Sequence, residues 1–261
     1  MIVAGCDVGS TTGKAVILTN GTIGSYEIID CLPNPVETAQ MVMDKAVKKA
    51  GISADQIEYT VGTGYGRMQI PFADKNISEI TCHGVGAFWV DPEVRTIIDI
   101  GGQDCKVIGL NDQGKVVDFV MNDKCAAGTG RFFEAMARVL NLSLEKLSTI
   151  SLEAHEVITL TNQCSVFTES EVITKLNEGK RVPDIAAGIQ AAIAGRLLVL
   201  IKRVGEKPAI TVAGGCAKNV GLVKAVEEKL GKEIKILSVE PQIIGALGAA
   251  VLAKEVHEQA Q

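Results

Sequence analysis

Short apolar runs alternate along the chain with longer segments whose apolar residues recur every three or four positions. Apolar runs that are bounded by turn residues are typical of strands, and they occur at 2–8, 57–61, 96–100 and 209–213. The longer pattern is typical of helices, which we predict at 36–51, 77–89, 132–140, 166–176, 185–204, 220–230 and 244–255. Strands mixed with helices along the whole chain favour an α/β fold.

An apolar strand that ends in Asp-x-Gly occurs twice. In both copies a polar turn and a second apolar strand follow, and a lysine lies seven residues after the aspartate: Lys14 after Asp7, and Lys106 after Asp99. Each copy is therefore predicted to open with a β-hairpin. The repeat predicts two similar domains facing a cleft, one formed by 1–92 with the C-terminal helix 243–261 and one by 93–242.

The turn of the first repeat gathers backbone N–H groups and hydroxyls at residues 9–13, directly before Lys14. Such a turn makes a concave site for phosphate. Asp7 and Asp99 stand at strand ends, where carboxylates hold Mg²⁺, usually through water. The strand at 209–213 ends at paired glycines, which let a flat ring approach the backbone. The chain has no P-loop motif, and these elements instead predict a separate kind of nucleoside triphosphate site.

In their order and spacing these elements resemble the two phosphate motifs and the adenosine motif of the actin, sugar-kinase and heat-shock-chaperone ATPases. The segments that carry the resemblance are 7–14, 99–106 and 213–215, and 245–250 is similar to the final connecting helix of that superfamily. The resemblance covers nearly the whole chain. It implies an α/β fold of two duplicated ribonuclease-H-like (actin-like ATPase) domains around a nucleotide cleft.

Two cysteines, Cys125 and Cys164, each lie just before a predicted helix, and Thr168 with Glu171 has the spacing of a capping box for the helix at 166–176. A helix N-terminus favours a thiolate. A cubane cluster needs four thiolates, which a twofold dimer with two cysteines per chain supplies. Cysteine is also a common core residue. The pattern alone therefore allows Cys125 and Cys164 to be either cluster ligands or core residues. We predict core positions for the other five cysteines: Cys6, Cys31, Cys82, Cys105 and Cys216.

Five further stretches look like signatures of the 2-hydroxyacyl-CoA dehydratase activators, a group that includes the benzoyl-CoA reductase ATPase subunits. These stretches are 62–67, 78–83, 100–104, 122–132 and 164–173. The resemblance implies that Cys125 and Cys164 share one [4Fe–4S] cluster across a homodimer. It also implies that ATP hydrolysis drives a low-potential electron from a ferredoxin or flavodoxin-like donor to a downstream iron–sulfur dehydratase or reductase, in oxygen-sensitive, anaerobic metabolism. The segment 27–36 is shorter than the family pattern, and 161–163 differs from it.

Carried over by position, the resemblance implies catalytic roles for Asp7, Asp99, Gln103 and Asp104. Asp7 and Asp99 would lie near Mg²⁺, while Gln103 and Asp104 would position the attacking water or the γ-phosphate. The residues that it implies in binding ATP or ADP are Gly9, Ser10, Thr11, Thr12, Gly13, Lys14, Gly101, Gly102, Glu134, Gly214, Gly215, Asn219 and Gln242.

The composition of the chain argues against several classes of protein. The chain of 261 residues is 47% hydrophobic and 22% charged, as in a soluble globular protein. Its net charge of −5 without a basic run argues against nucleic acid as a partner. The most apolar stretches, 185–201 and 243–253, are interrupted or shorter than the roughly 20 residues of a membrane span, and no secretory signal is visible. We therefore expect a cytoplasmic protein.

Two other functions remain compatible with the same fold. A small-molecule kinase of the sugar-kinase type would bind ATP and a phosphate acceptor but no iron. A docking or assembly factor would bind ATP without a cluster and without catalysis. Cys125 and Cys164 distinguish these alternatives, because only the activator function requires their thiolates.

Overall fold

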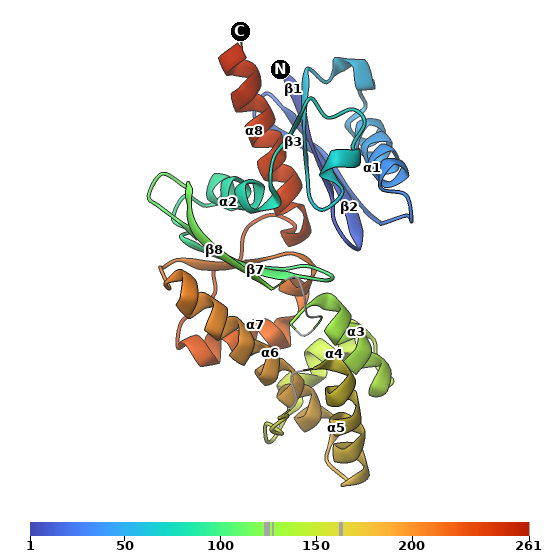
Figure 1. Cartoon of the computed structure of the whole chain (residues 1–261), viewed down its shortest axis with the longest axis vertical. Coiled ribbons are helices and arrows are strands. Elements are labelled where there is room, and N and C mark those ends of the chain that lie inside the picture. Colours follow the sequence, from blue (N-terminus) through green and yellow to red (C-terminus); the bar gives the residue numbers. More distant parts are fainter. Residues whose placement is uncertain (123–125, 127, 162–163, 261) are drawn as a thin grey trace. The chain divides into compact units, whose positions relative to one another are not determined.

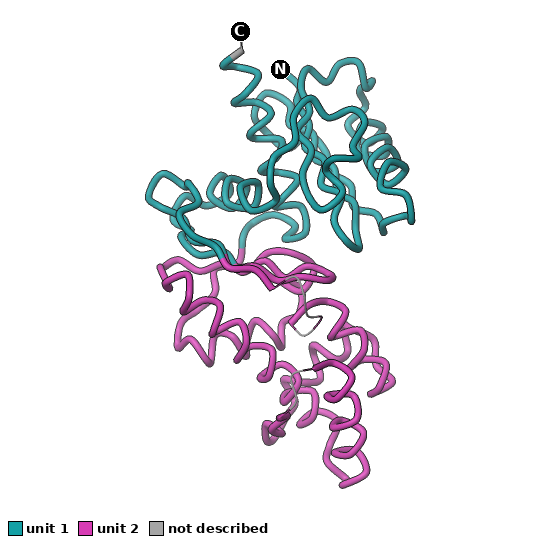
Figure 2. Tube along the Cα trace, viewed as in Figure 1, with its two compact units in different colours: residues 1–97, 108–119, 237–261 teal, residues 98–107, 120–236 magenta. Residues whose placement is uncertain are grey.

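The computed structural model describes residues 1–122, 126, 128–161 and 164–260 (Figure 1). The chain divides into two compact units, coloured separately in Figure 2. Unit 1 contains 1–97, 108–119 and 237–261, and unit 2 contains 98–107 and 120–236. The limits of the two ATPase domains expected from the sequence, 1–92 with 243–261 and 93–242, stay a prediction.

Unit 1 is built on a five-stranded sheet with the order β3-β2-β1-β4-β5. The predicted first hairpin is confirmed, because β1 pairs antiparallel with β2 and places Asp7 opposite Lys14. Strand β4 runs parallel to β1 on its other side, with Thr63 opposite Asp7. The strands are β1 (Ile2–Val8), β2 (Thr12–Thr19), β3 (Thr22–Asp30), β4 (Tyr59–Thr63) and β5 (Lys75–Asn76).

The alternation of side chains along β1 and β2 gives this sheet two apolar faces. Val3 belongs to the core cluster that includes buried residues of α8 (Ile244–Ala260). Ala4, the next residue, belongs to the cluster that includes buried residues of α1 (Pro35–Ala50). Gly5 allows α8 to approach β1 closely, since a Cβ there would lie 2.0 Å from the Ala246 carbonyl oxygen. Helix α2 (Glu79–Val90) packs against α8.

Local sequence explains where α1 begins and ends. The Asn34 side chain accepts a hydrogen bond from the Val36 N–H, and Pro35 follows at the first helical position. Gly51 ends the helix in the left-handed conformation, with φ of 68°. Three short 3-10 helices complete unit 1: Ala54–Gln56, Arg67–Gln69 and Pro241–Ile243.

The second sheet has four strands in the order β8-β7-β6-β9. Its strands are β6 (Thr96–Ile100), β7 (Cys105–Leu110), β8 (Val116–Asn122) and β9 (Ile210–Ala213). Three of the four limits between the two units fall within β6, β7 and β8. The order agrees with the second predicted hairpin, because β6 and β7 are neighbours and are joined by the short turn that carries Gln103.

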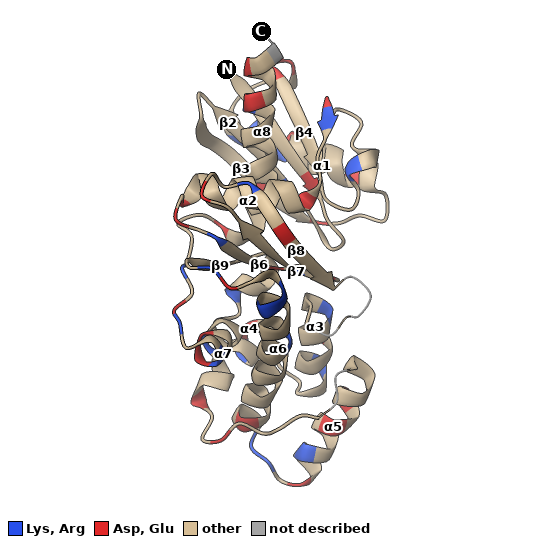
Figure 3. Cartoon of the chain, turned by 60° about the vertical axis from the view of Figure 1, so that its left-hand side comes forward, with Lys and Arg blue, Asp and Glu red and all other residues tan. Residues whose placement is uncertain are grey.

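Unit 2 packs its helices into one large apolar core. The helices are α3 (Gly130–Val139), α4 (Leu144–Ile150), α5 (Ser165–Asn177), α6 (Val182–Val204) and α7 (Val220–Leu230), with 3-10 helices at Ser151–Glu153 and Gly215–Lys218. The core gathers Phe132 and Phe133 of α3 with buried residues of α6 and α7. Acidic and basic residues are interspersed along the helices and loops of the chain (Figure 3).

Helix α6 is long and apolar enough to cross a membrane by length and composition alone. However, 61% of its most apolar window is buried inside the structure. Ile185, Ile189 and Leu197 of this helix are fully buried in the core of unit 2. We therefore interpret α6 as the core helix of this unit.

The sequence located most elements but missed some local details. Helix α4 and the short strand β5 were not predicted. The predicted capping box was wrong: α5 begins at Ser165 with Cys164 as its N-cap, so that Thr168 and Glu171 lie inside the helix. The Thr168 hydroxyl donates instead to the Cys164 carbonyl at 2.8 Å. Both carboxylate oxygens of Glu171 accept the Thr161 N–H, at 2.9 and 3.1 Å.

Candidate functional site

The first hairpin forms a tight turn around an ion pair. The Gly9 N–H donates to the Thr12 carbonyl at 3.0 Å and closes the turn. Lys14 Nζ lies 3.3 Å from Asp7 Oδ2 and donates to the same Thr12 carbonyl at 3.2 Å. Asp7 is buried, with 5% of its surface exposed. The turn therefore holds a carboxylate and a cation at the tip of the hairpin, as phosphate and Mg²⁺ binding would require.

Two glycines lie against the Asp7 carboxylate. Gly64 has φ of +86°, and a Cβ there would lie 2.3 Å from Asp7 Oδ1. A Cβ at Gly245 would lie 3.1 Å from Asp7 Oδ2. Both oxygens are thus kept clear of side chains from these positions, and carboxylate oxygens are the ligands that Mg²⁺ prefers, directly or through water. The Asp7 carboxylate therefore fits a magnesium ion bound through water, with Lys14 paired to its Oδ2 atom.

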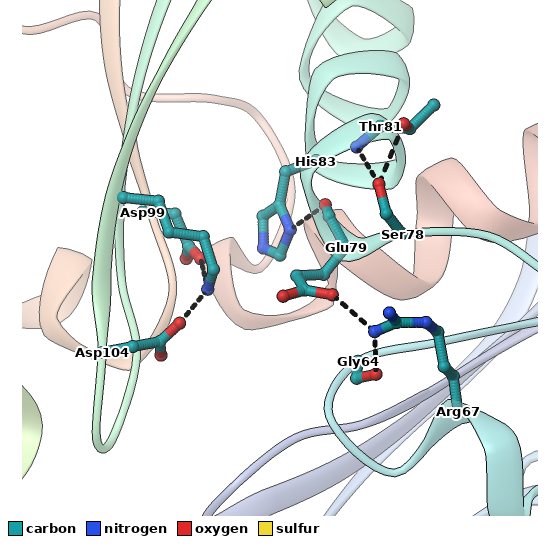
Figure 4. Close-up of polar contacts among 9 residues, drawn as sticks. Gly64, Arg67, Ser78, Glu79, Thr81, His83, Asp99 and Asp104 are labelled. Atoms are coloured by element: carbon teal, nitrogen blue, oxygen red, sulfur yellow. Dashed lines mark hydrogen bonds and ion pairs between the residues drawn. The ribbon is translucent and has the colours of Figure 1, made fainter. Parts of the chain in front are cut away.

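The second hairpin repeats the ion pair in a more buried form. Lys106 Nζ lies 3.2 Å from Asp99 Oδ2 and also pairs with Asp104 Oδ2. Figure 4 shows the two aspartates on the same side of the hairpin. All three side chains are buried, with at most 4% of each residue exposed. Burial alone would lower the pKa of Lys106, but the carboxylates of Asp99 and Asp104 outweigh it and raise this pKa above its usual value.

The two hairpins therefore share one geometry as well as one sequence pattern. The lysine seven residues after the aspartate contacts that aspartate in both, at 3.3 Å in the first hairpin and 3.2 Å in the second. Lys106 belongs to the repeat but is not among the predicted site residues. The shared spacing is the signal that would have identified it.

The turn of the second hairpin lies next to the glycine pair after β9. The Gly101 N–H donates to the Asp104 carbonyl at 2.9 Å, and Gln103 is exposed at the tip. Gly214 has φ of +78°, and a Cβ there would lie 2.7 Å from Asp99 Oδ1. In unit 2 the structure thus brings together four of the predicted site residues: Asp99, Gly101, Asp104 and Gly214.

The same turn is connected to the start of α3. The Gly130 N–H donates to the Gly101 carbonyl at 2.9 Å, and the Arg131 N–H donates to the Gly102 carbonyl at 3.0 Å. These are backbone N–H groups of the first turn of a helix, which have no partner within the helix. The predicted cluster ligand Cys125, which precedes α3 in the chain, lies outside the described residues.

Three other predicted nucleotide contacts have local partners. The Asn219 side chain caps α7 by accepting the Leu222 N–H at 2.9 Å and donates to Gln190 Oε1 at 3.1 Å. Glu134 accepts a hydrogen bond from Arg131 Nη1 at 2.7 Å on the surface of α3. Gln242 lies in the 3-10 helix before α8, and its N–H donates to Glu240 at 3.3 Å. Their roles toward a nucleotide stay a prediction.

Cys164 is exposed at the N-terminus of α5. Its side chain forms no capping hydrogen bond with the described residues of this helix. Val166, Phe167 and Ile173 of α5 are also exposed, with between 48% and 65% of their surfaces accessible. An accessible thiol at a helix N-terminus suits a cluster ligand. Within the described part of the chain, no three His, Cys, Asp or Glu side chains gather in a way that could hold a metal ion.

The five cysteines predicted for the core differ in burial. Cys6, Cys82 and Cys105 are buried, which confirms the prediction for these three, whereas Cys31 and Cys216 are half-buried. Burial raises the pKa of the Cys82 thiol to about 12 and that of Cys105 to about 11. It also raises the pKa of Cys216 to about 12. These thiols are therefore protonated at neutral pH.

Comparison with known proteins gives matches over the whole chain. The sequence model of the BadF/BadG/BcrA/BcrD ATPase family matches residues 4–253. The activator of lactoyl-CoA dehydratase from Anaerotignum propionicum is 44% identical over 260 residues, which cover 99% of this chain and all of that protein.

Solved structures also match over nearly the whole chain. The activator of the 2-hydroxyisocaproyl-CoA dehydratase from Clostridium difficile, with bound ADPNP, superposes with a TM-score of 0.94 at 42% identity and covers 100% of this chain and 97% of that one. A ROK-family glucokinase from Streptomyces griseus has a TM-score of 0.60 at 13% identity over 98% of this chain and 100% of the kinase, which shows the fold alone. The fold is that of the actin-like ATPases and sugar kinases.

Proposed function

Because the chain belongs to the BadF/BadG/BcrA/BcrD ATPase family, we propose that it couples ATP hydrolysis to electron transfer into a 2-hydroxyacyl-CoA dehydratase. The chain is an ATPase of that family, and two relatives that it matches over at least 97% of their length are named as activators of such dehydratases. The observation that carries the electron-transfer part is the exposed thiol of Cys164 at the start of α5.

Nucleotide binding uses the tips of the two hairpins. Residues 9–14 and the backbone at Gly101 and Gly102 contact the phosphates, and the ion pairs of Asp7 and Asp99 support this role. Asp7 of unit 1 and Asp99 of unit 2 are the residues that we assign to Mg²⁺ binding through water, and this ion would neutralise charge on the phosphates. The nucleoside is contacted by the residues predicted for it: Glu134, Gly214, Gly215, Asn219 and Gln242.

Water attack on the γ-phosphate requires a side chain that can reach the phosphate. Gln103 is exposed at the tip of its turn, while the Asp104 carboxylate is buried against Lys106. We therefore assign the water-positioning role to Gln103. Asp104 stabilises the turn, because its carboxylate pairs with Lys106 and its backbone carbonyl accepts a hydrogen bond from the Gly101 N–H.

The electron-carrying group is one [4Fe–4S] cluster, ligated by Cys125 and Cys164 of each chain in a homodimer. The exposed apolar residues beside Cys164 support a contact with a second chain there. Such a cluster supplies one-electron chemistry at low potential when it is bound. The bonds from Gly130 and Arg131 to the second hairpin connect the nucleotide turn to the segment that follows Cys125. We propose a soluble, cytoplasmic, oxygen-sensitive protein that takes electrons from a ferredoxin or flavodoxin-like donor.

The test combines the reduced protein, MgATP, an oxidised 2-hydroxyacyl-CoA dehydratase, such as lactoyl-CoA dehydratase, and the 2-hydroxyacyl-CoA substrate of that dehydratase under anaerobic conditions. We expect formation of the dehydrated acyl-CoA with ATP and none with the non-hydrolysable ADPNP, because hydrolysis makes the transfer one-way. The readout is product formation beside phosphate release. Dehydratase activation that is equal with ADPNP would contradict coupling, and transfer of phosphate to a sugar would support the kinase alternative.

The variant Asp7→Asn is expected to lower the kcat for phosphate release by about 100-fold, since it removes the carboxylate charge that would hold Mg²⁺ at the phosphates. Asp44→Asn is the matched control, because Asp44 is exposed on α1 and contacts Gln40. Its kcat should equal that of the unchanged protein. An Asp7→Asn variant that hydrolyses ATP at the full rate would remove Asp7 from the site.

A further inference from the structure

Two sequence motifs of unit 1 have no part in the nucleotide contacts described above. They are the glycine-rich segment 62–67 and the start of α2 at 78–83. The structure connects them through Arg67, whose Nη1 donates to the Gly64 carbonyl at 2.9 Å and to Glu79 Oε2 at 3.0 Å (Figure 4). Only 13% of the Glu79 side chain is exposed, against 35% for Arg67. One guanidinium nitrogen of Arg67 therefore binds both the Gly64 carbonyl and the side chain of Glu79, the first residue of α2.

Gly64, which Arg67 holds by its carbonyl, is the residue that lies against Asp7. A Cβ at Gly64 would lie 2.3 Å from Asp7 Oδ1 and 2.5 Å from the Val8 carbonyl oxygen. The Gly66 N–H donates to that Val8 carbonyl at 2.9 Å. The loop is therefore bonded to the end of β1, and any shift of Gly64 changes the space beside the Asp7 carboxylate.

Glu79, the partner of Arg67, is also held in place by its neighbours. Ser78 caps α2, because its hydroxyl accepts the Thr81 N–H at 3.3 Å. His83 is buried, and its Nδ1–H donates to the Glu79 carbonyl at 2.8 Å. Figure 4 shows Glu79 between the His83 ring and the Arg67 guanidinium. Glu79 is thus a rigid anchor from which Arg67 can hold the loop.

His83 is also close to Asp7, because both side chains lie beside Gly245. A Cβ at Gly245 would lie 2.8 Å from His83 Cε1 and 3.1 Å from Asp7 Oδ2. The His83 ring and the Asp7 carboxylate therefore flank the same glycine at the start of α8. Arg67 and Glu79 are thus connected to Asp7 through the Gly64 loop, and His83 is connected to it through Gly245. None of these three residues is in the repeat that contains Asp7.

We propose that Arg67 is a positioning residue for Asp7, holding the Gly64 loop against the carboxylate so that the carboxylate keeps the orientation that a magnesium–nucleotide complex requires. The proposal rests on the proposed function, since it assigns Asp7 to the magnesium site. A displacement of about 1 Å at such a site costs up to about 100-fold in rate. A surface ion pair without this role contributes little.

Arg67→Gln removes both contacts, and Arg95→Gln is the matched control. Arg95 has the same kind of partners in unit 1: its Nε lies 3.1 Å from Asp112 Oδ1, and its Nη1 donates to the Pro92 carbonyl at 2.7 Å. We measure ADP affinity by calorimetry on the whole protein with and without Mg²⁺, and kcat and KM for ATP. We expect Arg67→Gln to keep its affinity for ADP without Mg²⁺ but to lose most of the increase that Mg²⁺ gives. Its kcat should fall by about tenfold or more.

A conservative variant separates positioning from folding. Because one nitrogen of Arg67 makes both contacts, an ammonium can replace it in part, and Arg67→Lys should retain several-fold more activity than Arg67→Gln. Equal loss of ADP affinity with and without Mg²⁺, a change in KM alone, or equal effects in Arg95→Gln would overturn the proposal. If the unchanged protein neither binds nor hydrolyses MgATP, the proposed function fails, and the role of Arg67 fails with it.

Discussion

Replacing Cys164 with alanine is expected to abolish iron binding by the anaerobically purified protein. Cys164 is the N-cap of α5 and is exposed, so its thiolate is available to a cluster shared with a second chain. A cubane that loses two of its four thiolates, one from each chain of the dimer, has too few protein ligands to be retained. The measurement is iron and acid-labile sulfide per chain, read beside the ATP hydrolysis rate.

The loss should be specific to iron rather than a consequence of unfolding. The Cys164 side chain makes no capping bond with the described residues of α5, and the bonds to its carbonyl from Thr168 survive the substitution. Thermal stability measured in the absence of iron should therefore match that of the unchanged protein. Cys31→Ala is the control, because this half-buried thiol donates to the Gly9 carbonyl in unit 1. Full iron content in Cys164→Ala, or loss of iron in Cys31→Ala as well, would contradict the assignment.

Lys106→Met is expected to lower the free energy of unfolding by about 3–5 kcal/mol, because it leaves the buried carboxylates of Asp99 and Asp104 without their cation. Only 4% of the Lys106 side chain is exposed, so water cannot compensate for the loss. The pKa of Lys106, raised by the two carboxylates against the effect of burial, agrees with a charged lysine at neutral pH. Urea denaturation followed by circular dichroism measures the change.

Two further variants test whether the buried, unpaired carboxylates cause this loss of stability. Lys146→Met removes a lysine that pairs with Glu153 on the surface, with more than half of each side chain exposed, and should cost no more than about 1 kcal/mol. Adding Asp104→Asn to Lys106→Met removes one of the two carboxylate charges and should recover part of the stability. A loss below about 1 kcal/mol for Lys106→Met would mean that the second hairpin is not held by this ion pair.

The duplicated hairpins could be predicted because their information is local. An apolar strand, Asp-x-Gly, a polar turn and a lysine at fixed spacing are visible in the sequence, and antiparallel pairing across a short turn follows from them. The register places Asp7 opposite Lys14, as that spacing requires. The cysteine position at the start of α5 was predicted for the same reason, because a helix N-terminus is a local feature.

The partners of these residues could not be predicted, since they come from distant segments. The contact between Arg67 and Glu79 spans twelve residues and joins a 3-10 turn to a helix start, which no periodicity encodes. The bond between Asn219 and Gln190 spans 29 residues. The capping-box prediction for Thr168 and Glu171 was wrong because spacing cannot tell the first turn of a helix from the next, and Glu171 binds Thr161 instead.

Iron and sulfide content per chain, determined after strictly anaerobic purification together with the mass of the particle in solution, shows whether two chains share a cluster. We predict about two iron and two sulfide ions per chain in a dimer, which is one shared [4Fe–4S] cluster. We also expect the dimer to hydrolyse ATP. A protein that hydrolyses ATP but contains no iron, even after reconstitution with iron and sulfide, would rule out the proposed electron transfer.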